Sequence, residues 1–163
     1  MTPPSNPPCL LTATTIDALP EREQVHQFDA NAVRQVRSLG DLLGLTRLGV
    51  HRVRLAPGRA STTYHFHEGD EEFLFVLAGR GMAEIGEDRI EVGPGDFMAF
   101  PAGSPAHRLT NPFDEDLHYL MAGERTPLDV VRYPRDGLTM IRSGTTRRVV
   151  RDAHIENVHR ADS

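Results

Sequence analysis

From Leu45 to residue 122 the chain is a succession of short apolar segments separated by turn-forming residues, and this pattern restricts the possible folds more than any other feature. Glycine, proline and aspartate at the breaks are residues of tight turns. No stretch in this span has the apolar period of an amphipathic helix of ordinary length. The pattern is typical of an antiparallel sandwich or barrel, so we expect an all-β domain. Strands are expected at residues 47–55, 61–67, 72–78, 81–85, 89–92, 96–100, 106–111 and 117–122, and outside this span at 33–39 and 145–150.

Two histidines and a glutamate lie around one of the expected turns. His65 and His67 are two residues apart, and such side chains project from the same face of a strand, with Cα atoms about 6.5 Å apart. A glutamate that opens the next strand can reach back to both imidazoles. Two nitrogen donors and one carboxylate suit a divalent transition metal. A His-x-His pair on its own is more often surface polarity than a ligand pair, so the metal interpretation needs a second signal.

The residues alone do not decide which glutamate belongs to this group. Glu71 and Glu72 are adjacent, so they must point to opposite faces of the strand. Both faces of the segment 73–78 are apolar, and alternation therefore leaves the choice open. Two apolar faces also imply that the outer face is covered, either by the N-terminal segment or by another subunit.

The second signal is a block from Gly95 to Asn111, which reads G-DFMAF-P-A-G-SPA-H-RLT-N. Together with the block G-RASTTY-H-F-H-EGDE-E-FLFVLA-G, which begins at Gly58, it resembles the two signature motifs of the cupin superfamily. The spacing departs from the commonest form by one residue before His65 and by one residue before His107. The resemblance selects Glu72 over Glu71 and implies a four-residue ligand set for one divalent ion, either iron, zinc, nickel or manganese: His65, His67, Glu72 and His107.

The same resemblance implies a double-stranded β-helix, the jelly-roll barrel of the cupins, and it covers residues 34–142. We expect an extended N-terminal arm over residues 1–32, the barrel over 33–125, and a C-terminal extension over 126–163 that packs on the barrel. The segment 124–141 resembles the tail of a group of small bacterial cupins that are often labelled sugar-phosphate isomerases or oxalate decarboxylase-like proteins. Fold-level analogy does not establish a reaction.

Two functions remain open at this point. Four protein ligands in an octahedral arrangement leave two adjacent positions for a small oxygen-bearing ligand, so metal-assisted isomerisation, decarboxylation or oxygenation of a carboxylic acid, sugar or sugar phosphate is one expectation. Such reactions also need an acid or base, for which His51 and Tyr64 are the only candidates. The alternative is a non-catalytic cupin that binds or senses a small molecule through its metal.

Composition excludes several other classes of function. The formal net charge is −5, and no basic cluster indicates nucleic-acid binding. Cys9 is the single cysteine, which excludes an internal disulfide framework. No apolar run is long enough to cross a membrane, and the N-terminus lacks the pattern of a signal peptide. We therefore expect a cytoplasmic protein that acts on a small molecule, and the doubly apolar strand predicts a homodimer.

Overall fold

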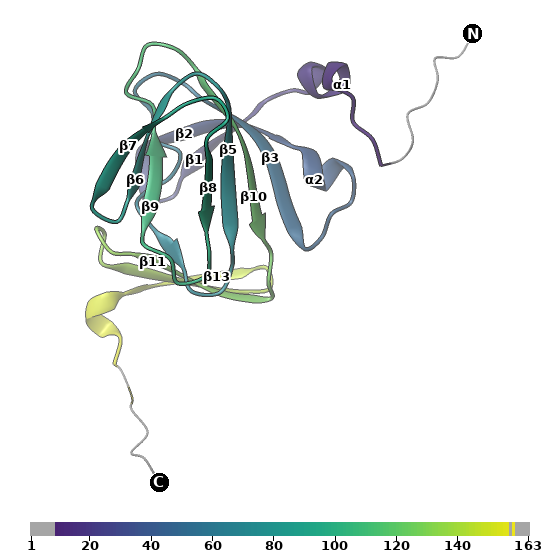
Figure 1. Ribbon diagram of the computed structural model, residues 1–163. Coiled ribbons are helices and arrows are strands. Elements are labelled where there is room, and N and C mark those ends of the chain that lie inside the picture. Colours follow the sequence, from purple (N-terminus) through teal and green to yellow (C-terminus); the bar gives the residue numbers. More distant parts are fainter. Residues whose placement is uncertain (1–8, 157, 159–163) are drawn as a thin grey trace.

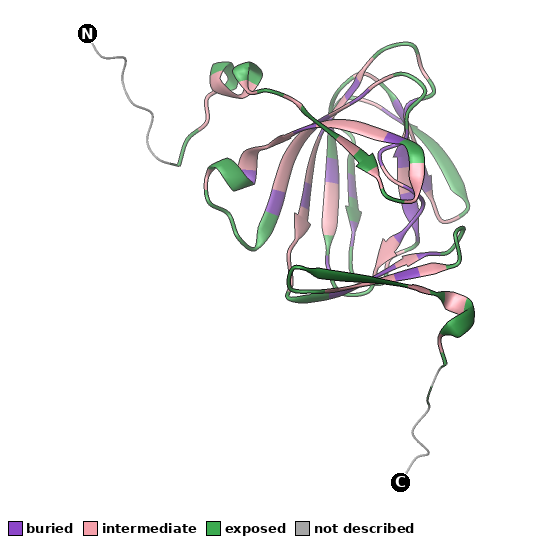
Figure 2. Cartoon of the chain, turned by 180° about the vertical axis from the view of Figure 1, so that it is seen from behind, coloured by how far each residue is buried: buried purple, intermediate pink, exposed green. Residues whose placement is uncertain are grey.

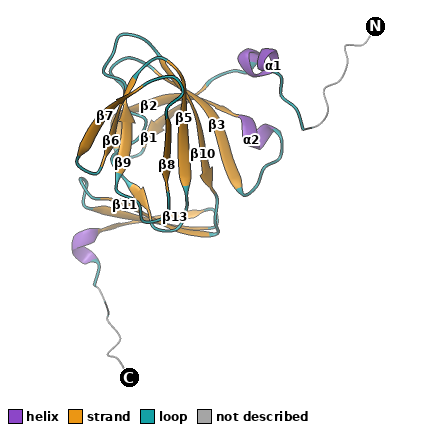
Figure 3. Cartoon of the chain, in the orientation of Figure 1, coloured by secondary structure: helices purple, strands orange, loops and turns teal. Residues whose placement is uncertain are grey.

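Two layers of antiparallel strands face each other across a common core in the computed structural model, which describes residues 9–156 and 158 (Figures 1 and 3). The first layer is a six-stranded sheet in the order β1-β2-β3-β10-β5-β8. Its strands are β1 (Arg22–His26), β2 (Asp29–Ser38), β3 (Leu48–Leu55), β5 (Glu72–Ala78), β8 (Phe97–Phe100) and β10 (Leu117–Glu124).

The second layer consists of two smaller sheets joined by an irregular segment. One sheet has the order β7-β6-β9 and the other the order β13-β12-β11-β4. Single β-bridges at Ala60 and His65 connect the segment before β4 to β9. Figure 1 shows β11 and its neighbours lying across the lower end of the barrel. The predicted all-β jelly roll is therefore confirmed. The strands are β4 (Phe66–His67), β6 (Gly81–Ile85), β7 (Asp88–Val92), β9 (His107–Thr110), β11 (Leu128–Tyr133), β12 (Leu138–Ser143) and β13 (Thr146–Arg151).

The core follows from the alternation of side chains along the strands of the first layer (Figure 2). Leu74 and Val76 on β5 point inward and are buried with Leu117 and Tyr119 on β10. Glu72 shares the inner face with Leu74 and Val76 because these residues are two apart. Gly79 ends β5 with a positive φ of 74°, and a Cβ at this position would collide with the backbone of Asp116, so only glycine fits this turn.

Two of the expected segments differ in the structure from the sequence-based expectation. The strand expected at 61–67 is regular only at Phe66–His67, because in the segment before it only Ala60 and His65 bridge to β9 and no continuous ladder forms. Residues 29–38 form one long strand that pairs with β1, so the chain joins the sheet from Arg22 onward and is not an extended arm there. Residues 1–8 of that expected arm, and residues 157 and 159–163 of the expected C-terminal extension, lie outside the described residues.

Three short helical segments, α1 (Ala13–Ala18), α2 (Leu39–Leu42) and the 3-10 helix η1 (Asp152–His154), flank the strands. The first begins after Thr12, whose hydroxyl accepts a hydrogen bond from the backbone N–H of Thr15, the usual role of a threonine N-cap. None of the helices in the described part of the chain has the length and apolar character needed to cross a membrane.

Candidate metal centre

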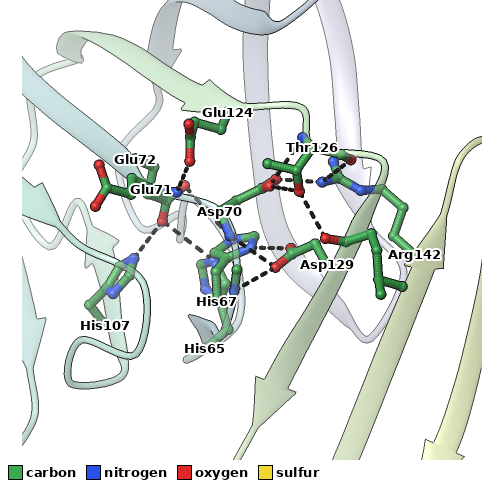
Figure 4. Close-up of polar contacts among 12 residues, drawn as sticks. His65, His67, Asp70, Glu71, Glu72, His107, Glu124, Thr126, Asp129 and Arg142 are labelled. Atoms are coloured by element: carbon green, nitrogen blue, oxygen red, sulfur yellow. Dashed lines mark hydrogen bonds and ion pairs between the residues drawn. The ribbon is translucent and has the colours of Figure 1, made fainter.

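Four side chains from three neighbouring segments meet at one end of the barrel lumen (Figure 4). His67 lies in β4, His65 precedes it by two residues, Glu72 opens β5 and His107 opens β9. His65, His67 and Glu72 each place one donor atom within 4.8 Å of the others. The Nε2 atom of His107 lies 2.6 Å from Oε1 of Glu72. The structure thus brings together all four residues that the sequence resemblance implied as ligands.

The three imidazoles are oriented so that Nε2 faces Glu72. The Nε2 atoms of His65 and His67 lie 3.6 and 3.9 Å from the Glu72 carboxylate. The opposite ring nitrogens are held by the surrounding protein: Nδ1 of His65 is 3.0 Å from the carbonyl oxygen of Thr63 and Nδ1 of His107 is 3.2 Å from that of Pro105. When Nδ1 carries the proton, Nε2 is a lone-pair donor, which is the tautomer that a metal ligand requires.

Asp129 on β11 orients the third imidazole, and sequence analysis did not identify it. Its Oδ2 lies 2.7 Å from Nδ1 of His67, while its Oδ1 accepts hydrogen bonds from the backbone N–H groups of Gly69 and Asp70. The side chain of Asp129 is almost completely buried. An aspartate on an apolar strand beyond the second motif was the available signal, but its partner is 62 residues away.

Burial and hydrogen bonding set the charge of this centre. Burial is the largest influence on His65 and lowers its pKa to about 4. Burial alone would raise the pKa of Glu72, but the hydrogen bond to His107 and the neighbouring imidazoles lower it to about 2. His65 is therefore neutral and Glu72 anionic at neutral pH, the states in which both bind a cation.

His67 and Asp129 form an ion pair at the edge of this centre. Burial acts to lower the pKa of His67, but the hydrogen bond to Asp129 and nearby carboxylates raise it above its ordinary value. For Asp129 burial acts to raise the pKa, yet His67 and two backbone N–H groups lower it to about 2. A proton on His67 is thus the main competitor of a metal ion at this set of donors.

The two acid–base candidates from the sequence lie elsewhere. The hydroxyl of Tyr64 donates to the carbonyl oxygen of Gly86 at 2.7 Å, and Arg135 stacks on the Tyr64 ring. Nδ1 of His51 is 3.1 Å from Oγ of Ser38. Neither His51 nor Tyr64 lines the cavity that contains the four-residue centre.

That cavity has a volume of about 670 Å³, large enough for a small metabolite. It extends from the centre to the β1-β2 hairpin, and its lining includes His26 and Tyr133. The Tyr133 ring lies between the rings of His65 and His26. Its centroid is 6.0 Å from that of His65 and 5.8 Å from that of His26. Sequence reasoning missed both residues because β1 and β11 were not expected as strands.

Comparison with known proteins identifies the family. The family model of the cupin domain matches residues 51–123, which include all four converging side chains. A crystal structure from Acidithiobacillus ferrooxidans, of a proposed sugar phosphate isomerase, superposes with a TM-score of 0.92 at 36% identity and covers 93% of this chain and 97% of that one. The chain belongs to the cupin superfamily.

Two further relatives of this cupin are informative. A crystal structure from Silicibacter pomeroyi, described as a sugar phosphate isomerase from a cupin superfamily, has a TM-score of 0.78 at 29% identity and covers 87% of this chain and 94% of that one. An uncharacterised protein of Methanocaldococcus jannaschii is 32% identical over 57 residues, which are 35% of this chain and 45% of the archaeal protein. The cupin therefore spans less than half of that curated relative.

Proposed function

We propose that this cupin binds one divalent transition metal ion through His65, His67, Glu72 and His107 and acts with it on a small polar metabolite. The observation that supports this proposal is the convergence of three imidazole Nε2 atoms on one carboxylate in a cavity. Three nitrogen donors and one oxygen donor suit iron, zinc, nickel or manganese. The ion would supply Lewis-acid or oxygen-activating chemistry to a ligand in the cavity.

The cavity wall favours a ligand that is rich in oxygen acceptors. Nδ1 of His26 accepts a hydrogen bond from the backbone N–H of Phe28, so the neutral ring carries its proton on Nε2. Burial lowers the pKa of His26 and raises that of Tyr133 to about 12. At neutral pH both side chains are therefore hydrogen-bond donors. A carboxylic acid, a sugar or a sugar phosphate fits this description.

Three reaction classes are compatible with these donor groups and this cavity. Isomerisation, decarboxylation or oxygenation of such a ligand is consistent with the donor set, and the two similar proteins described as sugar phosphate isomerases favour the first. One observation favours the alternative, a non-catalytic cupin that binds or senses the metabolite: His51 and Tyr64 lie outside the cavity. Without either residue, the proton transfer that an isomerase needs has no assigned group.

Elemental analysis of protein purified without added metal tests the metal proposal. We expect about one divalent ion per chain in the wild type and loss of that ion in a His65→Ala/His67→Ala double variant. Equal metal content in the two proteins would contradict the proposal. With the metal identified, the wild type is incubated in air with small acids and sugar phosphates. Turnover that the double variant lacks supports an enzyme, whereas metal-dependent binding of compounds that are recovered unchanged supports the binding protein.

We also infer a homodimer that forms through the outer face of the six-stranded sheet. Phe75 on β5 and Phe97 on β8 are directly paired in register, and Leu77 lies on the same face. Phe97 is 61% exposed. The α1 segment contacts a different part of this face, through the ion pair between Asp17 and Arg52 on β3. A contiguous apolar surface on neighbouring strands is typical of a protein interface.

A further inference from the structure

The cavity has a second polar end, distant in sequence from the four-residue centre. On β1 the residues Arg22, Gln24 and His26 alternate and line the cavity, and Arg34 on β2 pairs in register with Gln24 and lines it too. Side chains two apart share a face of a strand. The hairpin therefore presents a row of polar groups to the cavity.

Like the exposed Arg22, the half-buried Arg34 is a cationic group of this end without a counter-ion among the described residues. Its guanidinium contacts Oε1 of Gln24 at 3.3 Å and the sulfur of Met121 at 3.6 Å, and no carboxylate of the described residues lies within ion-pair distance of it. On the outer face of the same sheet Arg52 pairs with Asp17, and in the cavity Arg108 pairs with Glu84. A half-buried guanidinium without an anion is a favourable position for one.

Tyr119 provides an independent observation at the same end. The residue is 0% exposed and lines the cavity. Its hydroxyl is buried and forms no hydrogen bond with the residues that the structure describes. Burial raises the pKa of Tyr119, the nearby Arg34 and Ser61 side chains act to lower it, and the Glu72 carboxylate acts to raise it. Such an unsatisfied buried hydroxyl destabilises the folded protein, and a ligand acceptor would satisfy it.

We propose that Arg34 and Tyr119 form an oxyanion-binding site, which holds the phosphate or carboxylate group of a small metabolite in the cavity that the proposed metal ligands also line. The guanidinium supplies charge and paired N–H donors, and the phenol supplies one O–H donor. This site specifies the class of ligand for the proposed function. Where the rest of the metabolite lies depends on that proposed function: its other oxygen atoms would extend toward His65, His67 and Glu72. Binding of the oxyanion itself needs no metal.

Calorimetric titration of the full chain in EDTA, with inorganic phosphate and separately with acetate, tests this site. We expect millimolar or tighter binding of at least one anion, and the stronger one identifies the group. Arg34→Gln should weaken it more than about ten-fold, because a charge-assisted donor pair is lost. Tyr119→Phe should weaken it several-fold. The matched control is Arg52→Gln, which removes the same charge from the outer face and should bind as the wild type does.

Two further measurements separate this proposal from a folding effect and from the metal proposal. Without anion, Tyr119→Phe should unfold at the same temperature as the wild type or a higher one, since an unsatisfied hydroxyl is removed. Added anion should raise its unfolding temperature less than that of the wild type. Arg34→Gln should keep the metal content of the wild type. Wild type that binds neither anion, or Arg34→Gln that binds as the wild type does, would overturn the site while leaving the metal result intact. Loss of metal from Arg34→Gln would contradict the proposal that the oxyanion site and the metal site act independently.

Discussion

At the scale of single residues, Glu71 immediately precedes β5 and Glu72 opens it, and their side chains point in opposite directions. Glu72 faces the three imidazoles, whereas the side chain of Glu71 is exposed. We expect Glu72→Ala to lower metal affinity more than about 100-fold. Mutation of a residue that only hydrogen-bonds to a metal ligand typically lowers affinity about 10–100-fold, and Glu72 would be a direct anionic ligand. Glu71→Ala is the matched control and should bind metal as the wild type does. Equal metal content in the two purified variants would refute the assignment.

Asp129 holds the imidazole of His67, a proposed metal ligand, and this contact predicts a pH effect on metal binding. A proton on His67 excludes the metal, and the pKa of His67 is raised above its ordinary value of 6.5, so metal affinity should fall as the pH decreases through a range above 6.5. Asp129→Asn removes the anion that holds this proton. The midpoint of the pH dependence should therefore move to lower pH, while affinity at pH 8 falls about 10–100-fold.

Metal titrations of both proteins between pH 5 and 8 measure this effect. The control is Glu68→Gln, which changes an exposed neighbour of His67 that pairs with Arg132. It should leave the midpoint and the affinity unchanged. A midpoint that stays in place in Asp129→Asn would show that another group controls the pH dependence.

At the scale of elements, a buried ion pair attaches the C-terminal sheet to the loop between His67 and Glu72. Asp70 is 4% exposed. One of its carboxylate oxygens binds the Arg142 guanidinium of β12, and the other accepts hydrogen bonds from Thr126 (Figure 4). The position of β12 therefore determines the position of the loop 68–71 and, through Asp129, of His67.

Arg142→Ala should lower the free energy of unfolding by about 3–5 kcal/mol, because Asp70 is left as a buried charge without its cation. Urea unfolding of the metal-free protein measures the change. Arg80→Ala removes an exposed arginine that pairs with Glu91 and Glu115, and it should leave the urea midpoint close to that of the wild type. Comparable decreases in the free energy of unfolding of the two variants would mean that the buried ion pair stabilises the protein no more than the exposed one does.

At the scale of the whole molecule, the exposed apolar face of the six-stranded sheet predicts the assembly. Light scattering at micromolar concentration should return twice the chain mass for the wild type. Phe97→Glu places a charge opposite Phe75 in that face and should yield the monomer mass. Ile90→Glu alters an equally apolar position on β7, in the other layer, and should remain dimeric. A monomer mass for the wild type would exclude the homodimer.

The local pattern of the sequence determined the β-strands and grouped the metal-site residues. Strands such as β5 and β6 were predicted to the residue, because short apolar runs bounded by Gly79 and by other turn residues are a local signal. His65, His67 and Glu72 lie within eight residues of one another, so strand geometry alone brought two of them together. The family resemblance, and not periodicity, added His107 and chose Glu72 over Glu71.

Only the tertiary structure decided what surrounds that centre. Asp129 reaches His67 across 62 residues, and Arg34 lies beside Tyr119 because β2 and β10 flank β3 in one sheet. Long-range pairing of strands leaves no periodic trace in either partner, since each strand reads the same whichever neighbour it has. The sequence therefore specified which donors lie close together along the chain, whereas the closing of the barrel selected the partners that orient them and the groups that share their cavity.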